Sequence, residues 1–342
     1  MRAFITGLAG PALTEEERGF LREAQPWGFI LFKRNVTHAA ALRRLIDDAR
    51  VAVAREAPVL IDQEGGRVQR LGPPLWPAYP PGAAYGALFE RDRDTGLAAA
   101  RLGARLIAAD LAPLGIDVDC LPIADVLAGG ANPAIGNRAY STEPGTVAAI
   151  GAAVASGLAE GGLLPVLKHM PGHGRANVDS HHTLPVVDAD RATLDATDFA
   201  AFRPLAKLPL GMTAHVVFSA IDPIAPATIS ATIVRDVIRD SIGFKGLLMS
   251  DDISMNALAG SVSERARAAF AAGLDVVLHC NGVMPEMRAV AAEAPQLAGE
   301  AARRAEAALA AKKRPLPIDV AASRAEFISL MAGVWQPAQG LA

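Results

Sequence analysis

Hydrophobic residues are concentrated in short runs that recur along the chain, and each run is followed by polar residues or by glycine and proline. Most of these runs lack the alternation of a strand with one exposed face, so they are typical of parallel strands covered on both sides. Eight runs are predicted to be strands: Phe4–Leu8, Gly28–Phe32, Val59–Asp62, Ile116–Leu121, Leu164–Lys168, Leu210–His215, Leu247–Ser250 and Asp275–His279.

Helix signals lie between the predicted strands. Thr14 and Glu17 have the spacing of a capping box, in which each side chain satisfies a backbone N–H of the first turn. Thr37 is the expected cap of the next helix, which should run to about Ala57. Later helices are predicted over Ala231–Ile242 (capped by Ser230), Val262–Ala272 and Glu300–Lys313.

This alternation of eight strands with helices favours a single α/β (β/α)8 TIM barrel over a doubly wound sheet. We expect residues 1–313 to form the barrel as one catalytic domain, and residues 314–342 to form a short helical C-terminal extension packed on it. Residues 73–82 hold five prolines and are interpreted as a rigid surface loop.

Composition excludes several classes of protein. The chain is 51% hydrophobic, so it can bury a sizeable core, and its net charge of −3 gives no electrostatic reason to bind nucleic acid. No run of about 18 apolar residues predicts a membrane span, and the N-terminal residues lack the pattern of a secretory signal. Two cysteines, Cys120 and Cys280, suit a reducing compartment. We therefore expect a cytoplasmic protein.

Polar residues gather at the ends of the predicted strands, where TIM barrels hold their chemistry. Ionisable groups at the ends of apolar strands would cost several kcal/mol each if they were simply buried, so they are expected to converge on a polar pocket. These groups are found in residues 62–70, residues 168–174 with the continuing loop at residues 179–182, His215, residues 250–252 and His279.

Some of these residues also have a purely structural interpretation. His215 and His279 could be hydrogen-bonded core histidines, and Cys120 could be a buried thiol. Asp251 and Asp252 are adjacent, so their side chains point to opposite sides of an extended segment. One of the two is expected to react and the other to act as a structural hydrogen-bond acceptor.

Four of the seven histidines lie within residues 169–182, which raises the possibility of a metal site. His169 and His173 have the i, i+4 spacing of helical metal ligands, but Pro171 and Gly172 between them would break such a helix. We therefore expect neither a metal nor another cofactor, and a metal-dependent amidohydrolase is kept as an alternative.

Four ordered segments closely resemble glycoside hydrolase family 3, and in particular its single-domain bacterial β-N-acetylglucosaminidases. The segments are IDQEGGRVQRL (residues 61–71), KHMPGHG…DSHHTLP (168–185), MTAHVVFSAID (212–222) and LLMSDDISM (247–255). The resemblance covers roughly residues 1–310 and itself implies a TIM barrel.

The resemblance also implies roles for individual residues. It makes Asp251 the catalytic nucleophile and His181 the general acid/base, with Asp179 orienting His181. A histidine suits this role because its ordinary pKa, near 6.5, allows proton donation near neutral pH. Met170 replaces an expected aromatic residue, a change that affects packing and removes no functional group. The positions that hold the terminal sugar are Asp62, Arg70, Arg138, Lys168 and His169.

The activity implied by the resemblance is retaining hydrolysis of a terminal β-linked N-acetylglucosamine. Its substrate would be a small cell-wall fragment met in peptidoglycan recycling, N-acetylglucosamine linked to anhydro-N-acetylmuramic acid with or without peptide, and no obligate protein partner is implied. Three alternatives on the same barrel stay open besides the amidohydrolase. They are a phosphorylase that uses phosphate in place of water, attack by the substrate's own acetamido group, and a non-catalytic sugar-binding barrel.

Overall fold

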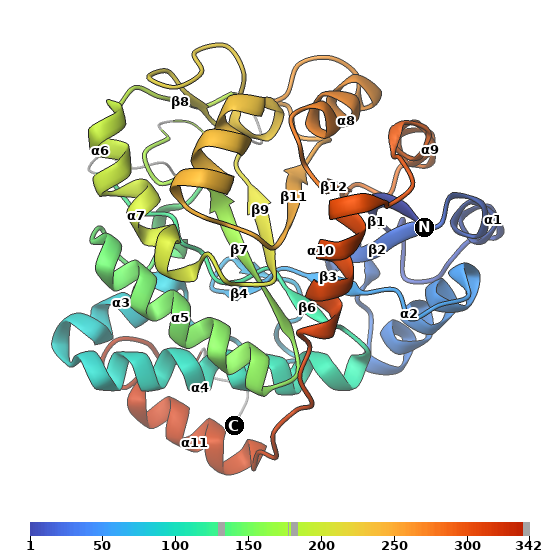
Figure 1. The fold of residues 1–342 in the computed structure, drawn as a ribbon. Helices are drawn as coiled ribbons and strands as arrows, with labels where there is room; N and C mark the ends of the chain where they lie inside the picture. The colour runs from blue at the N-terminus through green and yellow to red at the C-terminus, as the bar shows by residue number, and fades with distance from the viewer. Residues whose placement is uncertain (129–133, 177, 179–183, 338–342) are drawn as a thin grey trace.

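Eight parallel strands close into a barrel, and helices surround it (Figure 1). The computed structural model describes residues 1–128, 134–176, 178 and 184–337. Neighbouring strands around the barrel follow the order β1, β12, β11, β9, β7, β6, β3, β2. The TIM-barrel prediction is confirmed, since each predicted strand overlaps one barrel strand. Their bounds are β1 Arg2–Gly7, β2 Pro26–Leu31, β3 Val59–Ile61, β6 Val118–Asp119, β7 Leu164–Met170, β9 Leu210–Thr213, β11 Leu247–Asp252 and β12 Val276–His279.

Both faces of these strands are buried, which explains why the apolar runs do not alternate with polar residues. Ile5 of β1 lies beside Gly28 of β2 and Leu278 of β12, and belongs to a cluster that takes alternate residues from the strands. The intervening residues, such as Phe4, join a second and larger cluster with the helices. The two clusters together fix the strand ends, and so the positions of the polar residues that follow them.

The helices carry the expected start and stop signals in several places. The capping box of Thr14 and Glu17 is confirmed at the start of α1. Ser230 Oγ accepts a hydrogen bond from the N–H of Ile233 at 3.2 Å, although the segment that follows is π-helical. The helices are α1 Glu15–Ala24, α2 Ala39–Val53, α3 Gly82–Arg91, α4 Arg93–Leu111, α5 Pro144–Glu160, α6 Arg191–Ala196, α7 Asp198–Phe202, η6 Ile233–Ser241, α8 Val262–Ala271, α9 Met284–Glu293, α10 Gly299–Ala310 and α11 Val320–Leu330.

The predicted limits of α2 were wrong at both ends. His38, rather than Thr37, caps the helix, because its Nδ1 accepts a hydrogen bond from the N–H of Ala41. The helix ends at Val53 rather than near Ala57, since Ala54 adopts a left-handed conformation with φ of 53°.

A short antiparallel hairpin, absent from the sequence prediction, follows β3. Its strands are β4 (Gln63–Gly65) and β5 (Val68–Gln69). The Gln63 side chain accepts from the backbone N–H of Arg70 at 3.0 Å, which fixes the end of the hairpin. Gly65 has φ of 94°, and a Cβ there would lie 2.2 Å from the carbonyl oxygen of Pro80. The hairpin and residues 73–82 are therefore packed together beside the pocket.

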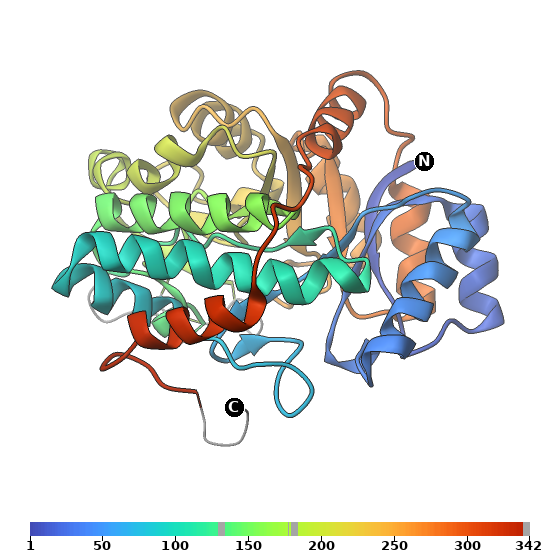
Figure 2. The same cartoon turned by 90° about the horizontal axis from the view of Figure 1, so that it is seen from below.

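The C-terminal part of the described chain packs on the outside of the barrel. α11 runs beside α4 in both views (Figures 1 and 2). Phe327 is buried, and its ring lies 6.4 Å from those of Tyr79 and Tyr85 and 6.2 Å from that of Trp335. These contacts join α11 to the loop at residues 73–82.

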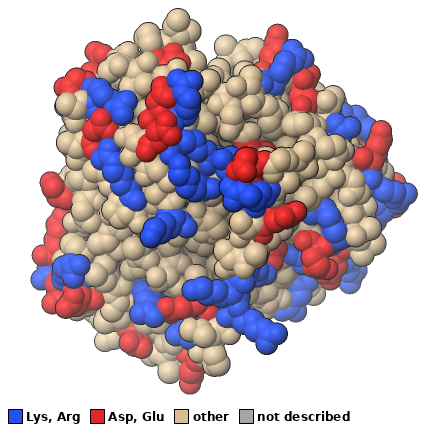
Figure 3. Space-filling view, in the orientation of Figure 1, with Lys and Arg blue, Asp and Glu red and all other residues tan. Residues whose placement is uncertain are grey.

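Charged side chains of both signs are interspersed on the face shown in Figure 3. This mixture is what a net charge of −3 leads one to expect. Among the helices that the structure describes, none is both long and apolar enough to cross a membrane.

Candidate active site

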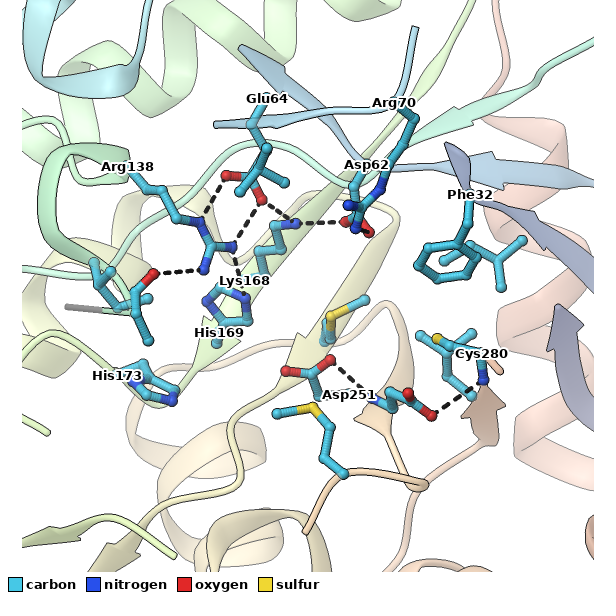
Figure 4. Close-up of a pocket in the computed structure, with 18 residues that line it drawn as sticks. Phe32, Asp62, Glu64, Arg70, Arg138, Lys168, His169, His173, Asp251 and Cys280 are labelled. Atoms are coloured by element: carbon cyan, nitrogen blue, oxygen red, sulfur yellow. Dashed lines mark hydrogen bonds and ion pairs between the residues drawn. The ribbon is translucent and has the colours of Figure 1, made fainter. Parts of the chain in front are cut away.

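A polar pocket with a volume of about 200 Å³ lies at the carboxyl ends of the barrel strands. The structure brings together at this pocket six residues that the sequence singled out from well-separated segments (Figure 4). These residues are Asp62, Arg70, Arg138, Lys168, His169 and Asp251.

One side of the pocket is a network of buried ion pairs around Lys168. Its Nζ lies 2.9 Å from Asp62 Oδ1 and 2.7 Å from Glu64 Oε1. Arg138 makes a bidentate pair with Glu64, with both N–O distances at 2.8 Å. Arg70 Nη2 lies 2.8 Å from Asp62 Oδ2. Two carboxylates thus bind three cations, which leaves hydrogen-bonding groups of both signs facing the pocket.

The network keeps its members charged. Burial alone would raise the pKa of Asp62, but Lys168 and Arg70 hold that pKa well below its ordinary value. Burial likewise opposes ionisation of Glu64, and the neighbouring Arg138 and Lys168 lower its pKa. The pKa of Lys168 is raised, because the two carboxylates outweigh the burial that would lower it. Fixed charges of this kind are suited to orienting sugar hydroxyls.

His169 follows Lys168 on β7 and is held by another buried carboxylate, that of Asp125. Its Nδ1 lies 2.7 Å from Asp125 Oδ2, and its Nε2 lies 3.5 Å from Arg138 Nη2. The ring of His173 packs edge-on against that of His169, with the centroids 5.9 Å apart. Burial lowers the pKa of His173 to about 4, so this ring is neutral at neutral pH.

Asp251 lies at the end of β11, across the pocket from the Lys168 network (Figure 4). Its Oδ1 accepts a hydrogen bond from the N–H of Asp252 at 2.7 Å. Burial raises its pKa, but His215, His169 and that N–H together bring the pKa below its ordinary value. The carboxylate is therefore ionised at neutral pH, as its predicted role as nucleophile requires.

The neighbouring Asp252 serves a different purpose. Its Oδ1 accepts from the N–H groups of Ser254 at 3.0 Å and Cys280 at 3.1 Å, and its Oδ2 accepts from Ser254 Oγ at 2.7 Å. These bonds join the turn after β11 to the end of β12. Of the two adjacent aspartates, Asp252 is thus the structural hydrogen-bond acceptor.

The other histidines at strand ends are hydrogen-bonded within the fold. His215 is fully buried, with Nδ1 2.7 Å from Thr228 Oγ1 and Nε2 2.9 Å from the carbonyl oxygen of Asp252. His279 Nε2 lies 3.1 Å from Glu286 Oε2. His215 therefore supports the turn behind Asp251 rather than facing the pocket.

Two predicted catalytic residues, His181 and Asp179, lie outside the described residues, so their roles stay predictions. The described segment before them, at residues 171–176, is closely packed against the backbone near Val126 at one position. Gly174 packs so closely on the backbone that a Cβ there would lie 2.0 Å from the carbonyl oxygen of Val126.

Among the residues that the structure describes, no group of three or more His, Cys, Asp or Glu side chains is placed to hold a metal ion. His169 Nδ1, which could otherwise bind a metal, contacts Asp125.

Sequence reasoning missed two residues of the site, Glu64 and Asp125. Glu64 lies in the IDQEGG segment, where the sequence predicts no role for it, and its carboxylate pairs with both Lys168 and Arg138. Asp125 is a single carboxylate in the apolar run that follows β6. A charged residue in such a run was the available signal, because a buried carboxylate requires partners.

Comparisons with known proteins identify the family of this chain. The model of the glycosyl hydrolase family 3 N-terminal domain matches residues 5–310. A β-hexosaminidase of Aromatoleum aromaticum is 37% identical over 304 residues, which cover 88% of this chain and 85% of that protein.

Solved structures of NagZ from Neisseria gonorrhoeae have the same fold. One, in complex with N-trifluoroacetyl-D-glucosamine, has a TM-score of 0.81 at 30% identity and covers 97% of this chain and 98% of its own. Another, in complex with zinc ion, has a TM-score of 0.85 at 30% identity with the same coverage. The chain therefore belongs to glycosyl hydrolase family 3 and is a glycoside hydrolase.

Proposed function

We propose that this protein is a retaining exo-β-N-acetylglucosaminidase that releases a terminal β-linked N-acetylglucosamine through a glycosyl-Asp251 intermediate. The observation that carries the proposal is the ionised Asp251 at a strand end, facing a fixed network of hydrogen-bonding charges across a small pocket. Support comes also from the related β-hexosaminidase and from the N-acylated glucosamine in the complex of the NagZ structure.

In the first step, an Asp251 oxygen bonds to the anomeric carbon while the bond to the leaving oxygen breaks and that oxygen takes a proton from His181. In the second step, His181 removes a proton from water, whose oxygen displaces Asp251. Asp62, Arg70, Arg138, Lys168 and His169 would hold the sugar hydroxyls and fix the ring for attack.

The natural substrate we propose is a cytoplasmic cell-wall fragment, N-acetylglucosamine linked to anhydro-N-acetylmuramic acid with or without peptide, in peptidoglycan recycling. The pocket volume of about 200 Å³ suits one sugar ring, which fits removal of a terminal unit rather than cleavage within a long chain. No cofactor enters the proposed reaction.

Turnover of an aryl β-N-acetylglucosaminide tests the proposal. Asp251→Ala should abolish hydrolysis, and a 2-fluoro sugar should label Asp251 in the unchanged protein, as mass spectrometry of the peptides would show. His181→Ala should slow substrates with poor leaving groups most, because these need the proton. Wild-type-like turnover by Asp251→Ala would reject the assignment.

The same assay separates the alternatives. Hydrolysis in phosphate buffer should give free sugar, whereas sugar phosphate as the main product would indicate a phosphorylase. Activity should survive exhaustive chelation, and its loss with recovery on adding a metal would favour a metal-dependent hydrolase. Failure of the 2-fluoro sugar to label Asp251 would point to attack by the acetamido group.

A further inference from the structure

Asp125 is a fully buried carboxylate between the segment after β6 and the end of β7. These two segments lie side by side, since the N–H of Ala124 donates to the carbonyl oxygen of Lys168 at 2.7 Å. Asp125 itself has no contact with solvent and does not line the pocket. Its effect on the sugar must therefore pass through another residue.

Both oxygens of Asp125 are used. Oδ2 lies 2.7 Å from His169 Nδ1, while Oδ1 accepts from the backbone N–H of His173 at 2.7 Å and, at 3.4 Å, from that of His169. Burial raises the pKa of Asp125, but His169, with the hydrogen bonds from its ring and from the backbone N–H of His173, lowers it below its ordinary value. An ionised carboxylate accepts hydrogen bonds and donates none.

This arrangement selects one form of the His169 ring. Because Asp125 can only accept, the proton on the ring must be at Nδ1. Nε2 faces the pocket and lies 3.5 Å from Arg138 Nη2, which is a donor. A second proton, on Nε2, would place the Nε2–H donor against the Arg138 Nη2 donor. Nε2 therefore presents a lone pair to the pocket.

We propose that Asp125 is a positioning residue that fixes the Nδ1–H form of His169, so that His169 Nε2 accepts a hydrogen bond from a hydroxyl of the bound sugar. The proposal rests on the proposed function in one respect, the contact of His169 with the sugar. Lys168, Arg70 and Arg138 can only donate hydrogen bonds, and His169 Nε2 is a neutral acceptor beside them. A sugar hydroxyl can donate to His169 and accept from a neighbouring cation at the same time.

The substitution Asp125→Asn keeps the shape of the side chain but offers one acceptor oxygen to two donors, the His169 ring and the His173 backbone. If the amide oxygen stays with His173, the amide NH₂ faces His169 and favours the opposite form, with the proton on Nε2. Nε2 then no longer accepts from the sugar. The close packing of Gly174 on Val126 gives the adjoining backbone a separate anchor that this substitution leaves in place.

The first measurement is nitrogen NMR of the histidine rings in the free protein, where the two neutral forms give different shifts. Asp125→Asn should move His169 away from the Nδ1–H form. Asp198→Asn is the matched control. Asp198, in α7, is also a buried carboxylate that contacts the segment after β7, because it accepts a hydrogen bond from Arg175 Nε at 2.6 Å, and it is not bonded to His169. This control should leave the His169 signal unchanged. An unchanged His169 signal in Asp125→Asn would overturn the proposal.

The second measurement is a double-mutant cycle on the aryl substrate. Asp125→Asn should lower kcat/KM by about 10- to 100-fold, mainly through KM. In a His169→Ala background the same substitution should lower kcat/KM by less than about threefold, because no imidazole ring remains for Asp125 to orient. Equal losses in both backgrounds would show a merely structural role and overturn the proposal. Absence of any wild-type hydrolysis would reject the proposed function instead, while the NMR result would still report on Asp125 and His169.

Discussion

The two sides of the pocket hold their charges in different ways. On the β3–β7 side, Lys168 lies within 3 Å of two carboxylates that are themselves paired with arginines. On the β11 side, the Asp251 carboxylate accepts a backbone N–H and is stabilised by histidines at longer range. The first arrangement holds donors and acceptors in fixed positions, as the proposed binding of sugar hydroxyls requires. In the second, the carboxylate is ionised and no cation among the described residues is paired with it, as the proposed attack on carbon requires.

The largest expected effect is on the Asp251 side and concerns rate alone. Asp251→Asn should lower kcat by about 10⁴-fold or more, because the amide cannot form the glycosyl intermediate. Stability should be unchanged or slightly higher, since an active-site carboxylate is retained for reactivity rather than for packing. Steady-state kinetics and urea denaturation of the same sample check this. If Asp251→Asn lost both activity and stability, Asp251 would also be needed for the fold, and the difference between the two sides of the pocket would be contradicted.

For Lys168, in contrast, we expect a loss of stability. Lys168→Met removes the cation shared by Asp62 and Glu64 and leaves two buried carboxylates with one arginine each. The free energy of unfolding should fall by about 3 kcal/mol, the lower end for breaking a buried pair, because the arginines still compensate in part.

A surface pair provides the control for this loss. Lys312 pairs with Asp117 and is 40% exposed, so Lys312→Met should change the free energy of unfolding by less than about 1 kcal/mol in the same denaturation assay. Equal losses in the two variants would show that burial of the Lys168 network does not strengthen it.

The fold was predictable because it depends on local pattern, whereas the pairing of charges depends on contacts between distant residues. Apolar runs that are covered on both faces mark all eight barrel strands, and the cap of α1 needs only Thr14 and Glu17. In contrast, Asp125 acquires its role from His169, 44 residues away. The end of α2 depends on the conformation of Ala54, for which the sequence holds no glycine as a signal. Six residues of the pocket were identified through motifs rather than through spacing.

The β3–β7 side should also respond to acid. The pKa of His173 is about 4 in the folded protein and near 6.5 when unfolded, so between these values only the unfolded chain takes up the proton. Stability should therefore fall by about 3 kcal/mol as the pH is lowered from about 6.5 to about 4, and this contribution is fully present above about 6.5. His173→Gln should give a flatter profile across that window in urea denaturation at a series of pH values, and a parallel one above pH 7. Identical slopes in the two proteins would contradict the prediction.

The smallest effect is expected at Asp252, next to the residue with the largest. Asp252→Asn keeps one oxygen that can accept from the N–H groups of Ser254 and Cys280. Its amide NH₂ can donate to Ser254 Oγ, which in the unchanged protein donates to Asp252. The loss should be about 1 kcal/mol in stability and less than about tenfold in kcat. If Asp252→Asn abolished turnover as completely as Asp251→Asn, both carboxylates would be acting on the substrate. That result would favour attack by the acetamido group, with the two acids assisting it, over a glycosyl-Asp251 intermediate. The ratio of the two kcat values therefore tests whether Asp251 reacts with the substrate while Asp252 only supports the turn after β11.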